Sequence, residues 1–256
     1  SDLEDDSTIQ TAQTVQRAAT AAGYNGGHMD ENAAKIGPIA APNLVNGSIT
    51  FAGTTGYNTA LGVTSTDLNR QPNGTGVGTT RPANWGDFIA MVHATNPFKQ
   101  GHQMSQRLGG DGTHDNLAPF TGSLNALHST RVESHVINQT DATGGDEFAD
   151  YDTTPVYGGN PGIVTWAQLQ FAGMTTAQQL AAMVTAGILT APVAAGILPT
   201  APLPAAQLIL ANTWLATYVN GAFPTSIICD ANFIDAIGGG IYHQTGNQQV
   251  TITNDF

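Results

Sequence analysis

Cysteine and positive charge are scarce in this chain. Cys229 is the single cysteine among 256 residues, which excludes an intramolecular disulfide framework and a zinc site built from cysteines. Lys and Arg number 7 against 19 Asp and Glu, which gives a formal net charge of -12 at pH 7. Because long-range attraction to a polyanion needs positive charge, this composition argues against a generic nucleic-acid-binding surface. A local basic cluster or a bound divalent metal could still hold a phosphate.

Long apolar runs are also absent. The stretch between Asp152 and Asp230 carries no Asp, Glu, Lys or Arg, but proline and glutamine recur within it. No apolar span therefore reaches the ~20 residues that a bilayer crossing needs, and no membrane span is predicted. The Gly-x-Ser-x-Gly pattern is missing too, which leaves a Ser-His-Asp hydrolase with little support.

What fills the uncharged stretch is alanine and threonine. Threonines precede three Ala-rich segments and predict three packed helices, of which the last follows Thr200 and ends before Gly221. Such a charge-poor region is a candidate surface for self-association or for a partner, and tightly packed helices of small residues are the alternative.

Composition divides the chain into four ranges. They are an N-terminal helix and loop-rich wrap, a central core, an Ala-rich helical region and C-terminal strands, over 1–80, 81–160, 161–225 and 226–256. The first range contains a helix predicted over 8–23, followed by short strands in "SITFAG" and "ALGVTS". At the other end, "IYHQ" and "QVTIT" predict a hairpin that turns at 245–247.

The central range holds the most local structure. An aromatic strand is predicted over 85–92, and a second short strand enters a histidine-rich loop through "QGHQM". A helix follows in "TGSLNALHSTRVESHVIN", with Thr121 or Ser123 as its cap. Strand, loop and helix therefore follow one another across this segment.

Five of the seven histidines and three of the few cations lie between residues 93 and 135. From Gly101 to Glu133 the sequence is "GHQMSQRLGGDGTHDNLAPFTGSLNALHSTRVE". Its order is Gly-His, Gly-Gly, Asn-Leu-x-Pro, and then Leu-Asn followed eight residues later by Glu. The ordered set is far more specific than any single piece of it.

This order resembles that of the histidine–metal finger nucleases, the superfamily that contains HNH endonucleases and the DNA/RNA non-specific endonucleases. It is also similar to nuclease-like cargo domains of contractile injection systems. The resemblance covers about 40 of the 256 residues. It implies a small ββα-metal finger core and says nothing about the flanking residues. Together with the composition of the flanks, the prediction is an α+β fold in which this core is embedded in a larger mixed domain with an Ala-rich helical C-terminal part.

The resemblance implies a role for each matching residue. His102 falls on the general base, whose neutral imidazole takes a proton from the attacking water. Asn125 falls on the metal-ligand position, and Glu133 on the carboxylate that holds the water shell of the metal. Asn116 falls on the residue that braces the histidine loop. The implied cofactor is a divalent cation, with Mg²⁺ first and Mn²⁺ or Zn²⁺ as alternatives, because amide and carboxylate oxygens suit Mg²⁺.

Helix geometry adds a constraint to these roles. In a regular α-helix, His128 shares the face of Asn125 and is a candidate second ligand or phosphate donor. Glu133 would lie about 80° round from Asn125 and two turns along, so the sequence predicts that Glu133 acts through water.

Two departures from the family pattern bear on activity. Lys99-Gln100 stands where the non-specific nucleases usually carry Asp-Arg, and Gly101 stands where the HNH type carries Asp. The guanidinium expected near the phosphate is therefore missing. Arg107 or Arg131 is expected to contact the phosphate in its place. Lys99 is a further alternative, but its single ammonium cannot form the two parallel hydrogen bonds that a guanidinium forms with a phosphate.

Two functions follow from these observations. The first is a metal-dependent endonuclease that hydrolyses DNA or RNA, which would suit a secreted or injected toxin with an immunity protein or a delivery particle as partner. The second is a catalytically inactive finger fold that acts as a structural or interaction protein through 161–225, which the net charge and the missing arginine favour. A competent site should bind the cation beside Asn125, whereas an inactive one should not.

Overall fold

The computed structural model describes residues 27–42, 47–57, 59–69, 74, 99–141, 147–159 and 204–255, with isolated positions between 177 and 196. The helix predicted over 8–23 and the strand predicted over 85–92 lie outside the described residues. Most of the first two Ala-rich helices also lie outside them.

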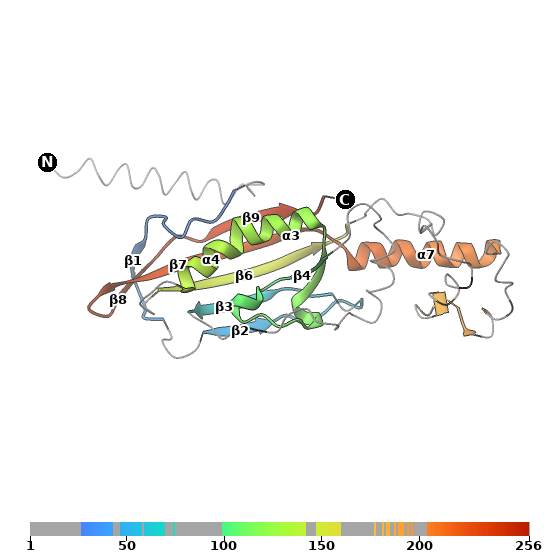
Figure 1. The fold of residues 1–256 in the computed structure, drawn as a ribbon, viewed down its shortest axis with the longest axis horizontal. Coiled ribbons are helices and arrows are strands. Elements are labelled where there is room, and N and C mark those ends of the chain that lie inside the picture. The colour runs from blue at the N-terminus through green and yellow to red at the C-terminus, as the bar shows by residue number, and fades with distance from the viewer. Residues whose placement is uncertain are drawn as a thin grey trace.

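A seven-stranded antiparallel sheet forms the body of the molecule (Figure 1). Its order is β1-β8-β7-β6-β3-β2, and β9 pairs with the free part of β7. The strands are β1 Ile36–Ile39, β2 Ser48–Phe51, β3 Val63–Leu68, β6 Glu147–Tyr157, β7 Pro224–Gly238, β8 Ile241–Gln244 and β9 Gln248–Thr253. The fold is thus mixed α+β, and strands from the N-terminal, central and C-terminal ranges of the chain share one sheet.

The longest pairing joins β6 to β7 and sets the face on which the site is built. Side chains alternate between the two faces of a strand, so every second residue points to the same side. In β6 this rule places Ala149, Tyr151 and Thr153 together, and all three are buried. The polar groups of Tyr151 and Thr153 therefore enter the interior of the molecule from the middle of the sheet.

The C-terminal strands do not form the predicted hairpin. The turn lies instead at Gly238–Gly240, where three consecutive glycines take positive φ values of 97°, 63° and 75°, a conformation that glycine adopts readily. β8 and β9 then follow one another along the same edge of β7. Residues 245–247 interrupt this edge as a bulge, in which Thr245 N donates to Phe233 O at 2.8 Å and Thr245 Oγ1 accepts from Phe233 N at 2.9 Å.

A second, two-stranded sheet carries the histidine loop. β4, Lys99–His102, pairs antiparallel with β5, Leu117–Phe120. The loop between them contains two 3₁₀ turns, η1 Gln106–Leu108 and η2 His114–Asn116. The predicted strand that enters the histidine loop is therefore confirmed.

The predicted helix is present, and it follows β5, a strand that was not itself predicted. It consists of α3 Gly122–His128, a π-helical turn η3 Ser129–Glu133 and α4 Ser134–Asp141. Thr121 is the cap, because its Oγ1 accepts a hydrogen bond from Leu124 N at 3.2 Å. The π-helical turn was not predicted.

This helix packs across one face of the large sheet (Figure 1). α4 contacts β6 and β7, while α3 contacts β9 and both strands of the small sheet. Between the layers lies a core of buried apolar side chains, which include Phe120, Leu124, Val132, Val136, Ile227 and Phe233. Removal of these side chains from water fixes the helix, and with it the histidine loop, on the sheet.

The last Ala-rich helix is confirmed as α7, Ala205–Ala222, which extends beyond the end of the sheet in Figure 1. Gly221 lies inside α7 rather than after it. A Cβ atom at Gly221 would lie 2.2 Å from the ring of Tyr57, so the glycine permits a close approach and does not end the helix. None of the described helices combines the length and hydropathy needed to cross a membrane.

Candidate functional site

Asn116 holds together the two ends of the loop that follows His102. Its side chain is fully buried, and its Oδ1 accepts a hydrogen bond from Met104 N at 2.8 Å. Its Nδ2 donates to Met104 O at 3.0 Å and to Asp111 O at 2.7 Å. The main chain adds a bond from Gln103 N to Asn116 O at 2.8 Å. Asn116 thus fixes the chain as it leaves the strand end that carries the half-buried His102.

The Gly-Gly pair in this loop meets two different steric demands. Gly109 has φ +91°, in the left-handed region that glycine tolerates. Gly110 lies against the loop itself, because a Cβ atom there would be 1.9 Å from Met104 O and 2.8 Å from Asn116 Nδ2. The tight path of the loop therefore needs glycine at both positions.

Gly110→Ala is expected to lower the free energy of unfolding by about 1–3 kcal/mol, because the added methyl group overlaps backbone that cannot move without breaking the Asn116 bonds. Urea denaturation followed by circular dichroism measures the change. Gly246→Ala is the matched control, since nothing lies within 4 Å of a Cβ atom at that position. Equal midpoints for the two variants would contradict the steric argument.

The π-helical turn brings Glu133 beside His128. Ser134 N donates to Ser129 O, five residues back, which is the bond that defines a π turn. A π turn contains one residue more than an α-helical turn. Glu133 therefore takes the position round the helix axis that residue 132 would have in a regular α-helix. Its Oε1 is 3.9 Å from His128 Nδ1.

The same turn corrects the angle expected from an uninterrupted α-helix. With one residue taken up, Asn125 and Glu133 are separated by about 20° instead of about 80° round the axis. They still lie roughly 11 Å apart along the axis. By this count the half-buried Asn125 and the buried Glu133 lie on the same side of the helix, and solvent would have to connect the two residues to any ion that they share.

Burial controls the charge of the His128–Glu133 pair. Burial lowers the pKa of His128 to about 3, with a smaller contribution from the nearby His102. Burial raises the pKa of Glu133 to about 8. At neutral pH both groups are therefore mostly uncharged, so their 3.9 Å contact is not an ion pair. Glu133 Oε1 is buried and makes no hydrogen bond within the described part of the chain.

In metal-free buffer this pair is expected to make stability fall as pH rises from about 6.5 to about 8. Up to the raised pKa of about 8, folded Glu133 keeps a proton that the unfolded chain releases near 4.5. His128 has the opposite effect below pH 6.5, where stability rises with pH. The unfolded chain binds a proton at His128 there, whereas the folded chain, with a pKa of about 3, does not. The two effects cancel between 4.5 and 6.5, which leaves a loss of up to about 1.4 kcal/mol per pH unit above 6.5.

Urea denaturation of native protein and Glu133→Gln at pH 6.5 and pH 8 checks this expectation. The buried titratable neighbours, Tyr151 and Cys229, have pKa values raised by burial, so they stay uncharged over this range. The glutamine variant should lose little stability between the two pH values. If it loses as much as the native protein, Glu133 is not the titrating group.

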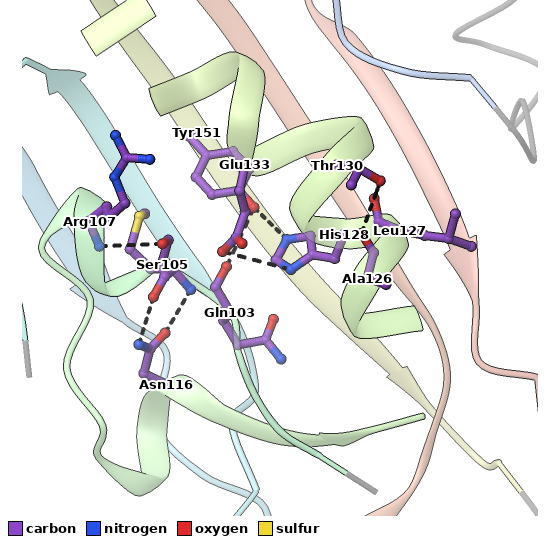
Figure 2. A network of polar contacts seen from close by, with 11 residues as sticks. Gln103, Ser105, Arg107, Asn116, Ala126, Leu127, His128, Thr130, Glu133 and Tyr151 are labelled. Carbon is purple, nitrogen blue, oxygen red and sulfur yellow. Dashed lines mark hydrogen bonds and ion pairs between the residues drawn. The ribbon is translucent and has the colours of Figure 1, made fainter. Parts of the chain in front are cut away.

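Tyr151 and Gln103 join the site although neither was predicted as a site residue. His128 Nε2 lies 2.7 Å from Tyr151 Oη, which in turn lies 3.5 Å from Gln103 O (Figure 2). Gln103 is fully buried, and neither atom of its amide has a hydrogen-bond partner within the described residues. The available signals were a tyrosine on the inward face of an alternating strand and a glutamine adjacent to the histidine.

The two arginines expected near the phosphate differ in their surroundings. Arg107 is exposed and its Nη2 lies 2.6 Å from Asp141 Oδ2. Such exposed pairs contribute about 0–1 kcal/mol, so a phosphate could displace Asp141 at little cost. Arg131 is half-buried within the π turn, and its carbonyl oxygen accepts a hydrogen bond from Met29 N at 2.9 Å.

The described residues contain no group of three or more His, Cys, Asp or Glu side chains placed to hold a metal ion. A cation held by an amide oxygen and water needs no such group of side chains. No protein-family model, curated protein or solved structure matches this chain. The residue pattern and the geometry of this site are therefore the features that indicate a function.

Proposed function

We propose that the protein is a metal-dependent endonuclease that hydrolyses phosphodiester bonds in DNA or RNA. The observation that carries the proposal is the order and packing of the site: β4 ends at His102, β5 pairs back on it, and the next helix carries Asn125 and Glu133, with Glu133 beside His128. This arrangement supports a ββα-metal finger, in which a strand end and a helix converge on one phosphate.

The residues present fit a hard divalent cation. Asn125 offers an amide oxygen, and Glu133 Oε1 is a buried oxygen that lacks a hydrogen-bond partner among the described residues. Amide and carboxyl oxygens, together with water, are the ligands that Mg²⁺ prefers. We assign Asn125 as the direct ligand and Glu133 as the group that holds water on the cation. When bound, the cation neutralises negative charge that develops on the phosphate.

The chain supplies the remaining chemistry through His102. Its neutral imidazole accepts a proton from the water that attacks phosphorus, while Asn116 keeps the strand end in place for that transfer. His128 orients Glu133, because its Nε2 contacts Tyr151 and its Nδ1 faces the carboxyl group. Arg131, or Arg107 released from Asp141, contacts the phosphate.

The test is release of acid-soluble nucleotides from plasmid DNA and from RNA with Mg²⁺, Mn²⁺ or Zn²⁺. Cleavage should require the cation, stop with EDTA and return when excess metal is added. This activity would suit a secreted or delivered toxin, whose partner would be an immunity protein or a delivery particle. No release by folded protein with any of the three metals would overturn the proposal.

A second candidate is an inactive finger fold that acts as an interaction protein. One observation favours it: α7 exposes two large apolar side chains, with Ile209 66% and Leu210 52% exposed. Exposed apolar surface of this kind is found at protein contacts. Light scattering of native protein and of Ile209→Ser/Leu210→Ser distinguishes self-association through α7 from a monomer.

A further inference from the structure

Tyr151 lies outside the histidine segment but is bound to both of its halves. It comes from β6 of the large sheet, 18 residues beyond Glu133 in the sequence, and its side chain is fully buried. Its hydroxyl contacts the imidazole of His128 on the helix and the carbonyl of Gln103, the residue after His102 (Figure 2). The small sheet that carries His102 is separate from the large sheet, so this hydroxyl is a direct polar link between them.

The hydrogen-bonding groups restrict the directions that this link can take. A phenol has one proton to donate and can accept at the same time. If Tyr151 donates to Gln103 O, it accepts from His128 Nε2–H, and His128 Nδ1 is then an acceptor that faces Glu133. Phe120 stands edge-on to the same imidazole, with ring centroids 6.0 Å apart. The ring is thus held at its tip by the hydroxyl and at its side by an aromatic edge.

We infer that Tyr151 is a positioning residue that fixes the strand end carrying His102 relative to the helix face carrying Asn125 and Glu133. The inference deepens the proposed function and depends on it. Both groups must converge on one phosphate, and displacements of about 1 Å are costly in such a geometry. The hydroxyl of Tyr151 is shared between the two elements, whereas its ring only fills space in the core.

Tyr151→Phe separates these two contributions because it keeps the ring and removes the hydroxyl. In metal-free protein, Mn²⁺ binding followed by electron paramagnetic resonance should weaken by about 10–100-fold, the usual effect of removing a group that orients a ligand's support. In steady-state cleavage, kcat should fall about 10-fold while KM changes less than about twofold.

The same strand offers a matched control in Tyr157→Phe. Tyr157 Oη donates to Ala60 O at 2.6 Å in a part-buried position, so this variant also loses a hydroxyl bond to a carbonyl, but one that involves neither His128 nor Gln103. Both variants are assayed at a temperature where circular dichroism shows them folded. Tyr157→Phe should bind Mn²⁺ and turn over as the native protein does.

Three results decide the matter. Weaker Mn²⁺ binding and lower kcat in Tyr151→Phe alone would support the inference. Native-like values in Tyr151→Phe, or equal losses in Tyr157→Phe, would overturn it and leave the nuclease proposal standing. Native protein that neither binds Mn²⁺ nor cuts nucleic acid would overturn the proposed function, and the inference with it.

Discussion

Under the proposed nuclease function, His102→Ala is expected to lower kcat for phosphodiester cleavage by about 10²-fold or more, because the attacking water would lose its proton acceptor. The side chain is half-buried at the end of β4, where backbone pairing with Leu117 holds the strand in place without it. The fold should therefore survive the substitution. Nucleotide release under saturating metal and substrate measures the effect, and Mn²⁺ affinity should change little.

Two comparisons separate a lost base from a damaged structure. His28→Ala is the matched control, since His28 is exposed and, among the described residues, contacts His135 edge-on at a centroid distance of 6.0 Å. It should keep native activity. Added imidazole should restore part of the activity of His102→Ala, because a soluble base can enter the half-buried position. An active His102→Ala variant would remove His102 from the mechanism.

Asn116→Ala is expected to lower the free energy of unfolding by about 3–5 kcal/mol. The variant loses three hydrogen bonds from a fully buried amide. Each such bond contributes about 1 kcal/mol, and the groups left buried without a partner cost more. Here those groups are Met104 N–H, Met104 O and Asp111 O. Urea denaturation measures the change, and released loop backbone should also lose protection from hydrogen exchange.

An exposed asparagine provides the control for this prediction. Asn247 donates to Asp230 Oδ1 at 3.2 Å on the surface, so Asn247→Ala should change stability by less than about 0.5 kcal/mol. A similarly small change in Asn116→Ala would show that water replaces the side chain, and that the Asn116 hydrogen bonds do not hold the loop closed.

Local patterns predicted the elements on which the site stands. The strand before the histidine loop, the cap at Thr121 and the helix that follows depend on neighbours in the sequence, and all three are present. The predicted hairpin at 245–247 failed because two turn signals competed. The chain turns at the glycines 238–240 instead. β8 and β9 therefore each pair with β7 and not with one another.

The sequence by itself determined that His102, Asn116, Asn125 and Glu133 stand in one ordered segment, with a strand before the histidine loop and a helix after it. Only the tertiary structure decided that Tyr151 joins them and that a π turn brings Glu133 beside His128. The physical reason is the separation in the sequence between the residues that interact. Caps and strand patterns are set by residues a few positions apart, whereas the choice of a partner from another strand is made when the helix packs on the sheet.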